Sequence, residues 1–110
     1  MILPVRPFND KVLHTTCANV GNPCEGLDKT IVDMWETMEA HKGVGLAAPQ
    51  VAIAMRFFVV NLENQTRKLV MINPTIVEFG KEKDKAPEGC LSAPGMTVTM
   101  KRPRRVVVSF

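Results

Sequence analysis

One helical pattern, in a chain otherwise made of short strand-forming runs, sets the class of fold. Apolar residues recur at helical spacing, with acidic residues between them, at Leu27, Ile31, Met34, Trp35 and Met38. This stripe predicts a core-facing amphipathic helix from about Asp28 to His41, with Asp28 as its N-cap, His41 and Lys42 in its last turn, and Gly43 ending it. We therefore expect an α+β fold, in which one long amphipathic helix packs against short, mostly antiparallel strands.

The remaining segments predict an irregular arm before the helix and a series of strands after it. Prolines at positions 4, 7 and 23 break the first 26 residues, which we expect to lie across the core through Leu3, Val5, Val12 and Leu13. Strands are expected over residues 55–62, 68–72, 75–79, 96–100 and 106–110, the first of them buried on both faces. The expected connections are a polar turn over 61–67, Asn73-Pro74, a charged loop over 80–85, and a turn at Ala93-Pro94-Gly95.

Length and composition exclude several classes of protein. A chain of 110 residues with 45% hydrophobic residues is typical of one soluble globular domain, and no apolar run is long enough for a membrane helix. The first residues are too short and too soon broken by proline for a signal peptide, which predicts the cytoplasm. Three cysteines without a Cys-x-x-Cys pair argue against a disulfide scaffold or a zinc ribbon, so Cys17 and Cys24 are expected to be free or structural thiols.

The net charge of +3 is concentrated near the end of the chain, at Lys101, Arg102, Arg104 and Arg105. A basic patch of this kind attracts phosphates, so a ribosomal contact stays open. A solvated strand edge guarded by basic side chains is the simpler explanation. No other segment resembles a nucleic-acid motif, and we expect no specific nucleic-acid partner.

Two segments about forty residues apart carry the candidate chemistry. The first, residues 43–50, predicts a tight, half-buried turn that ends in the amide of Gln50, which could donate to a carbonyl oxygen and to charge developing there. Its simpler explanation is a pair of glycines that ends the preceding helix. The second, residues 87–92, contains Cys90. As a thiolate, Cys90 could be a soft ligand for zinc or ferrous iron, or a nucleophile. As a neutral thiol, it could simply be a small core side chain.

Together, Gly-Val-Gly-Leu-Ala-Ala-Pro-Gln and Glu-Gly-Cys-Leu-Ser resemble the first two of three signature motifs of the peptide deformylases. These metalloenzymes remove the formyl group from the N-terminal methionine of nascent chains. The resemblance extends upstream through Ile2-Leu3 and residues 9–13, and it implies a single peptide-deformylase-like domain over residues 1–110. The third motif, a helical His-Glu-x-x-His, is absent, since the only histidines are His14 and His41. The chain also ends within a strand-forming run, so we expect it to be truncated and to lack the C-terminal metal-binding helix of the family.

The resemblance implies roles for seven residues. Cys90 would bind Fe²⁺, with Zn²⁺, Ni²⁺ or Co²⁺ as substitutes, while the missing motif would supply two more ligands and the general base. Metal-activated water would attack the formyl carbon of an N-formylmethionyl peptide, and the Gln50 amide and the Leu91 backbone N–H would hold the oxyanion. Val44, Gly45 and Gly89 would bind the peptide, and Glu88 would orient the loop. With one ligand, the 110-residue chain is expected to be metal-poor and inactive by itself.

Two other functions stay open. The first is a non-catalytic relative that keeps the peptide groove and binds N-terminal peptides without turnover. The second uses Cys90 as a nucleophile, with His14 or His41 as its base.

Overall fold

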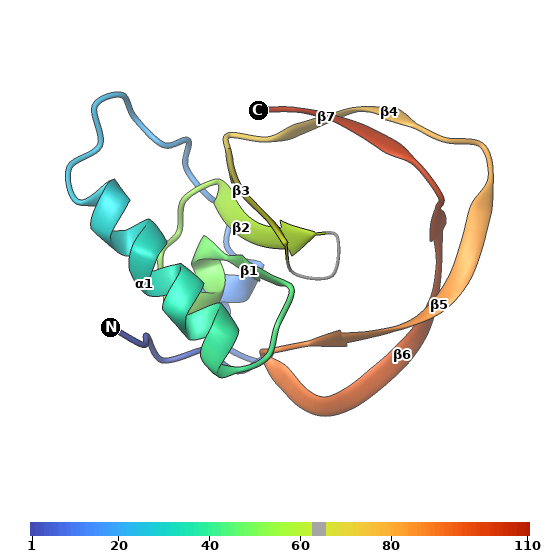
Figure 1. Ribbon diagram of the computed structural model, residues 1–110, viewed down its shortest axis with the longest axis horizontal. Helices are drawn as coiled ribbons and strands as arrows, with labels where there is room; N and C mark the ends of the chain where they lie inside the picture. Colours follow the sequence, from blue (N-terminus) through green and yellow to red (C-terminus); the bar gives the residue numbers. More distant parts are fainter. Residues whose placement is uncertain (63–65) are drawn as a thin grey trace.

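The computed structural model describes residues 1–62 and 66–110, and within them a single α-helix packs on a small sheet (Figure 1). The helix, α1, spans Leu27–Ala40, and the sheet has the order β1-β2-β3 with both pairs antiparallel. Its strands are β1 (Gly45–Ala47), β2 (Phe57–Leu62) and β3 (Arg67–Ile72), and two 3₁₀ helices, η1 (Lys11–His14) and η2 (Ala48–Val51), complete this part. The predicted α+β class is confirmed.

The core lies between α1 and the sheet and includes the predicted helical stripe. Met34 and Met38 are fully buried against Leu46 of β1 and Val59 of β2, and each such side chain contributes about 1.5–3 kcal/mol by leaving water. Leu27, Ile31 and Trp35 pack half-buried around them. The β2 strand is fully buried on one face only, because its burial alternates along the strand, so the expectation of a strand buried on both faces is wrong.

Helix α1 starts one residue earlier than predicted, and Asp28 is not its N-cap. Gly26 occupies the cap position in the left-handed region at φ 76°, and its carbonyl oxygen accepts hydrogen bonds from both the N–H and the hydroxyl of Thr30. A glycine adopts this conformation without steric cost, which explains why the chain can enter the helix here. Asp28 lies in the first turn instead, where its carboxylate suits the helix dipole.

The end of α1 also differs from the prediction, because His41 is the C-cap and Lys42 lies beyond the helix. Lys42 is left-handed at φ 55°, its N–H donates to Glu39 O, and the N–H of Gly43 donates to Met38 O at 2.9 Å. These paired bonds close the last turn in the Schellman manner, with a lysine at the position where glycine is usual. Gly43 therefore does not supply the left-handed residue that ends the helix.

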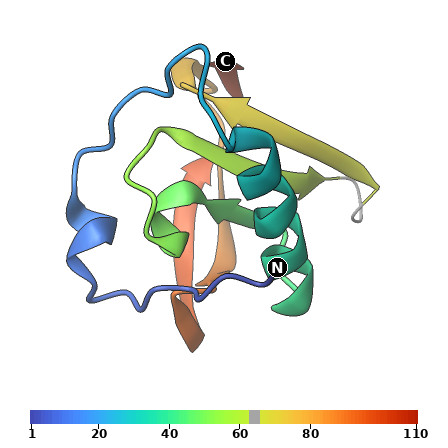
Figure 2. The same ribbon diagram turned by 90° about the vertical axis from the view of Figure 1, so that its left-hand side faces the viewer.

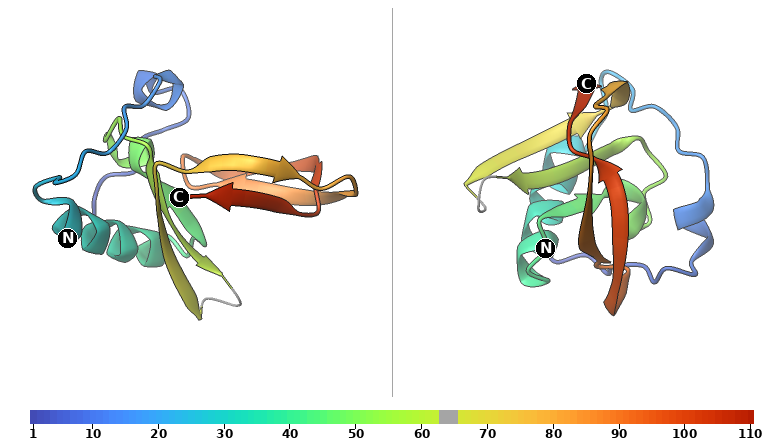
Figure 3. Two further views of the ribbon diagram at one scale, coloured as in Figure 1. Left: turned by 90° about the horizontal axis from the view of Figure 1, so that it is seen from above. Right: turned by 90° about the vertical axis from the view of Figure 1, so that its right-hand side faces the viewer.

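Residues 75–109 form one continuous two-stranded structure, which we call the arched ribbon. Strand β4 (Thr75–Phe79) pairs with β7 (Val106–Ser109), and β5 (Lys83–Cys90) pairs with β6 (Ala93–Pro103), all antiparallel. Backbone bonds from Gly80 N to Arg105 O and from Arg104 N to Glu82 O join the two pairs. The ribbon leaves the sheet on the side opposite α1, curves outward, and returns its tip to the body of the molecule (Figures 1 and 3).

Two predicted connections are strands in the structure. The charged stretch expected as a loop over 80–85 enters β5 at Lys83. Ala93-Pro94-Gly95, expected as a turn, belongs to β6, and the turn lies just before it, at Leu91 and Ser92. Oppositely charged side chains explain the first difference, because they pair across the strands: Arg102 with Glu88, and Arg104 with Asp84 and Glu82. The predicted turn over 61–67 is shorter than expected, since Leu62 ends β2 and Arg67 begins β3; residues 63–65 lie outside the described residues.

Polar contacts fasten the base of the arched ribbon to the N-terminal arm. Asn73, left-handed at φ 51°, accepts the Val20 N–H at 2.8 Å and donates to Val20 O at 3.1 Å. The Arg56 guanidinium bridges Asn19 and the carbonyl of Pro74. The arm itself wraps around the body from η1 past the sheet to α1 (Figure 2). No helix in the described parts of the chain is both long and apolar enough to cross a membrane.

Candidate functional site

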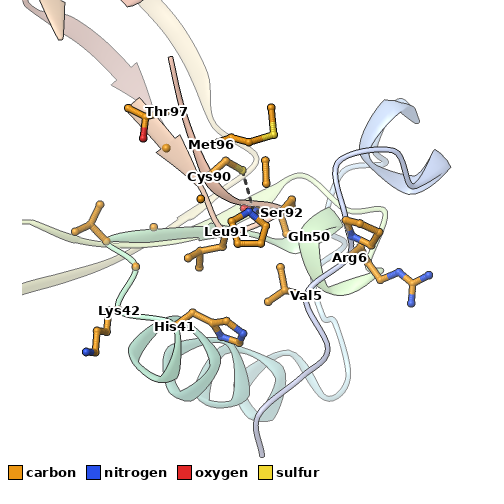
Figure 4. A pocket seen from close by; sticks show the side chains of 18 residues that line it. Val5, Arg6, His41, Lys42, Gln50, Cys90, Leu91, Ser92, Met96 and Thr97 are labelled. Carbon is orange, nitrogen blue, oxygen red and sulfur yellow. Dashed lines mark hydrogen bonds between the residues drawn. The ribbon is translucent and has the colours of Figure 1, made fainter. Parts of the chain in front are cut away.

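A cleft of about 950 Å³ lies where the arm, the end of α1 and the tip of the arched ribbon meet (Figure 4). Val5 and Arg6 contribute one wall from the arm, and residues 41–45 contribute a second from the end of α1. Gln50 lies at its base, and residues 89–97 of the ribbon close the remaining side. Segments far apart in the sequence therefore share one open space.

Gln50 is held by η2 so that its amide nitrogen faces the ribbon tip. Its side-chain oxygen accepts the backbone N–H of Ala47 at 3.0 Å, which fixes the amide plane at the start of the 3₁₀ turn. The amide nitrogen then donates to Ser92 Oγ at 3.1 Å and contacts Cys90 Sγ at 3.5 Å (Figure 4). The segment predicted as a glycine turn is thus a short strand followed by a 3₁₀ turn, and its last side chain does reach the cysteine.

Leu91 and Ser92 form the turn at the tip of the arched ribbon, and they attach this tip to the rest of the molecule. A Cβ placed on Gly43 would lie 2.8 Å from Leu91 Cδ1, so the leucine side chain uses the space that this glycine leaves. Ser92 is buried, and its carbonyl oxygen accepts the Phe8 N–H at 2.8 Å while its hydroxyl accepts from Gln50. These contacts position the neighbouring Cys90, whose side chain is exposed to the cleft.

All six residues singled out from the sequence line this cleft: Gln50, Leu91, Val44, Gly45, Gly89 and Cys90. Val44 is 60% exposed, as an apolar side chain that meets a ligand would be. A Cβ on Gly45 or Gly89 would meet no atom of the chain closer than 3.6 Å, so neither glycine is required by packing. Both glycines line the cleft, so their backbones are accessible to a ligand within it.

Sequence reasoning missed the contributions of Ser92 and of the arm. Ser92 stands in the second motif, but nothing in its sequence context indicated that its hydroxyl would accept from Gln50. The Arg6 N–H donates to Gln50 O at 2.7 Å, so the arm is fastened directly to the site. The apolar residues of the arm predicted its course over the core, where Leu3 packs against the core cluster and Val5, Val12 and Leu13 do not, and they contained no signal for this bond.

The two histidines lie in different places. His14 Nε2 faces Phe8 O at 3.1 Å on η1. His41 lines the cleft, and its Nδ1 lies 2.9 Å from Thr37 O. Because a carbonyl oxygen only accepts, Nδ1 carries the hydrogen, and in the neutral ring the free lone pair is on Nε2. The structure therefore brings His41, and not His14, into the same cleft as Cys90.

The described residues do not form a complete metal site. Among residues 1–62 and 66–110, no three side chains of His, Cys, Asp or Glu come together in a way that could hold a metal ion. Protein sites for zinc use three or four protein ligands, so Cys90 with one thiolate does not fit such a site by itself.

Comparison with known families and structures agrees with the two motifs. The family described as polypeptide deformylase matches residues 2–110. The peptide deformylases of Finegoldia magna and Thermotoga maritima are 38% and 44% identical over 106 residues, or 96% of this chain, which spans 65% and 63% of their own lengths.

Solved structures give the same result. The crystal structure of the Thermotoga maritima peptide deformylase matches with a TM-score of 0.91 and 42% identity, over 98% of this chain and 72% of that one. A class I type b peptide deformylase from Acinetobacter baumannii, bound to Met-Ala-Ser, matches with a TM-score of 0.89 and 32% identity, over 98% of this chain and 75% of that one.

Proposed function

Because the chain belongs to the polypeptide deformylase family, we propose that it acts in removing the formyl group from the N-terminal methionine of nascent peptides. The observation that carries this proposal is the 3.5 Å contact between the Gln50 amide nitrogen and Cys90 Sγ inside the cleft. Hydrolysis of a formyl amide by this family needs a hydrogen-bond donor for the carbonyl oxygen and, beside it, a thiolate that can bind a metal ion. We further propose that residues 1–110 act as one domain, in the cytoplasm, where nascent peptides and ribosomes occur.

The peptide would lie along the cleft between the arm and the ribbon tip. Gly45 and Gly89 line the cleft and have no side chains, so an extended peptide could approach both backbones closely. Val44 offers an exposed apolar side chain at the same edge, next to Gly45, and these two residues would border the methionine side chain.

Two donors would hold the negative charge that develops on the formyl oxygen. The Gln50 amide is already oriented by its bond to Ala47, and the Leu91 backbone N–H is positioned by the packing of Leu91 against Gly43. Donors fixed before the reaction need no reorganisation during it, and one such donor stabilises the transition state by about 2.7–4 kcal/mol. As the substrate enters, its carbonyl oxygen would replace the Cys90 and Ser92 atoms as the acceptor of the Gln50 amide.

The family uses a metal, and Cys90 is the residue of this cleft that would serve as a ligand. One thiolate does not complete a site, so we propose that this chain by itself retains Fe²⁺, Zn²⁺, Ni²⁺ or Co²⁺ poorly. A complete set would need the two histidines of a His-Glu-x-x-His segment. Measuring the metal content of the purified chain checks this point, and a stoichiometric ion in the 110-residue chain would contradict it.

The decisive experiment compares two proteins purified without oxygen and supplied with ferrous, nickel or cobalt ion. One is the 110-residue chain, and the other is the same chain joined to the part of the Thermotoga maritima relative that follows its matched region. We expect the joined protein to deformylate a formyl-methionyl peptide, with kcat reduced about 10²–10³-fold by Gln50→Ala. A joined protein that holds stoichiometric metal without turnover would overturn the proposal.

A second candidate function is supported by the intact cleft together with the incomplete ligand set. A non-catalytic relative would bind N-terminal peptides, formylated or not, without hydrolysing them. Binding of a formyl-methionyl peptide by the 110-residue chain, together with no turnover by the joined protein, would favour this function. Turnover by the 110-residue chain alone would instead mean that other groups complete the site.

A further inference from the structure

Strands β5 and β6 of the arched ribbon separate their charged residues between two faces. In their register, Lys83 lies opposite Pro103, and Lys85 lies opposite Lys101. Residues directly opposite each other share a face, and successive residues alternate, so the odd-numbered positions form one face and the even-numbered positions the other. We call the odd-numbered one the lysine face, and it carries Lys83, Lys85, Lys101, Thr97 and Thr99.

The basic residues of the even-numbered face have acidic partners. Arg102 Nε lies 2.7 Å from Glu88 Oε2, and Arg104 Nη2 lies 3.0 Å from Asp84 Oδ1. The exposed apolar side chain of Val98 belongs to the same face, opposite Glu88. Most of the basic stretch near the end of the chain is therefore neutralised within the ribbon itself.

The lysine face, by contrast, has no acidic residue. Within residues 1–62 and 66–110, its three ammonium groups form no ion pair with a carboxylate, and Lys85 and Lys101 face each other directly. Like charges in directly opposed positions destabilise a pair of strands. The chain has 14 basic and 11 acidic residues, so these three lysines equal its whole net charge of +3.

An anionic partner explains an arrangement that destabilises the free ribbon. An anion bound between Lys85 and Lys101 would turn their repulsion into two attractions. Lysine binds phosphate as a point charge, and the threonine hydroxyls on the same face can donate to phosphate oxygens. Both strands are exposed along almost their whole length, so the lysine face is accessible.

We propose that the lysine face binds the phosphate backbone of RNA without reading its sequence. Every nucleotide carries a phosphate, whereas acidic residues occur only here and there in peptides. Stable binding to a membrane surface also draws on apolar side chains, and Val98 lies on the opposite face. The choice of RNA rests on the proposed function, because nascent peptides are made beside RNA, but the separation of charge does not.

The lysine face begins at the edge of the cleft and leads away from it. Thr97 lines the cleft and pairs with Gly89, and Lys85 lies four residues from Gly89, or about 13 Å along β5. None of the three lysines lines the cleft. RNA on this face would therefore lie beside a peptide in the cleft without displacing it.

Fluorescence anisotropy of a short single-stranded RNA of mixed sequence measures the binding. The 110-residue chain is used below the concentration at which it associates. Three phosphate contacts on a single strand predict a slope of about −2 for log affinity against log salt. We therefore expect the affinity to fall about 20-fold between 50 and 200 mM salt.

Lys85→Glu separates binding from folding, because it places opposite charges across the strands. We expect the affinity for RNA to fall about tenfold or more at low salt, while the unfolding temperature rises by about 1–5 °C. Lys85→Arg should keep the binding. Lys11→Glu is the matched control, since it makes the same change of charge at an exposed lysine of η1, and it should bind RNA nearly as the parent does.

Equal affinities of the Lys85→Glu and Lys11→Glu variants for RNA would overturn the proposal. Tighter binding to a polyglutamate peptide, or to vesicles of anionic lipid, than to RNA would overturn it as well. In the joined protein, Lys85→Glu should leave turnover of a short formyl-methionyl peptide within about twofold of the parent, since a short peptide does not reach this lysine. Turnover without RNA binding would refute the lysine face alone, whereas RNA binding without turnover would refute the proposed function and leave the lysine face standing.

Discussion

Gln50 performs two tasks with one side chain, because its oxygen is bound to Ala47 while its nitrogen faces Cys90 and Ser92. Gln50→Glu keeps the acceptor for Ala47 and replaces the donor with a negatively charged oxygen. The Cys90 thiolate would then lose a donor and gain a like charge. Since a hydrogen bond to a charged group is worth about 1.5–3 kcal/mol, we expect alkylation of Cys90 by iodoacetamide at neutral pH to slow by about tenfold or more.

Cys17 and Cys24 provide the control within the same protein, since both are free and lie outside the cleft. Their alkylation rates should not change in the Gln50→Glu variant. An unchanged rate at Cys90 would show that the Gln50 amide does not act on this thiol in solution.

We predict that the protein loses stability in alkaline solution because the Met1 ammonium group loses its proton. The hydrogen bond to Asp33, followed by that to Glu36, raises the pKa of this ammonium group above its usual 8.0. Because the folded pKa is the higher one, its contribution is complete below about pH 8 and is lost as the pH rises through the folded pKa. The ammonium group and Lys29 both bind the Asp33 carboxylate, and together they lower its pKa. The stability that comes from this lowered pKa is lost only in acid.

Urea denaturation at several pH values checks this prediction. The free energy of unfolding of the chain with a free Met1 amine should fall above about pH 8 more steeply than that of the same chain acetylated at Met1. All other groups are the same in both chains, so the difference isolates Met1. Parallel curves for the two chains would contradict the prediction.

At the level of single residues, the structure brings together the side chains that the sequence singled out, while their roles stay predictions. Gln50 and Cys90 stand in motifs whose residue types suit donation and ligation, and both line one cleft. Asp33 was not distinguished from the other acidic residues of the helix, because its burial depends on the N-terminal ammonium group, which comes from a segment 32 residues away. Periodicity within one element contains no information about a partner of this kind.

Among the elements, the contact of the ribbon tip with Gly43 is sensitive to a small change. Gly43→Ala places a methyl group 2.8 Å from Leu91 Cδ1, so the leucine must move. Overpacking costs about 1–3 kcal/mol, and the cost here lies at the lower end because Leu91 Cδ1 is the end of a flexible side chain. We expect a lower free energy of unfolding and faster exchange of the Phe8 amide hydrogen, which is bonded to Ser92.

Gly45→Ala is the matched control, because its Cβ would come no closer than 3.6 Å to any atom of the chain. Its free energy of unfolding should stay close to that of the parent. Leu91→Ala in the Gly43→Ala background should remove the overlap between the two side chains. Equal stabilities for the two alanine variants would show that the tip is not seated on Gly43.

The helix and the sheet were easier to predict from sequence than the arched ribbon. Periodicity identified α1 to within one residue at each end, and β2 and β3 were identified by their apolar runs, whereas β1 was predicted as part of a turn. The ribbon contains charged residues that usually indicate a solvated loop. Their strand conformation depends on partners such as Glu88 and Arg102, which pair across the ribbon and are not adjacent in sequence.

For the whole molecule, the main feature is the amount of apolar surface that the arched ribbon exposes. Phe79, Met96 and Val98 are each more than half exposed, as is Val77. Apolar surface of this extent favours association. We expect the 110-residue chain to sediment as larger species as its concentration rises, and to bind a hydrophobic dye.

Replacing Phe79 and Val98 with lysine should reduce both effects without changing the core. Val32→Lys is the matched control, because Val32 is similarly exposed but lies on α1. It should leave the association unchanged. A chain that stays monomeric at all concentrations would contradict the prediction.

The attachment of the arched ribbon at both its base and its tip has a consequence for how the protein folds. The two strands of the ribbon can find their register locally, but Gln50 and Cys90 are 40 positions apart and meet only when the tip docks. Contacts between distant residues form late, because loop closure costs entropy before the contact stabilises the chain. We therefore expect the cleft to be assembled in the last step of folding. A partly folded chain would then have its helix and sheet but no site, and binding at the cleft would appear together with the native state rather than before it.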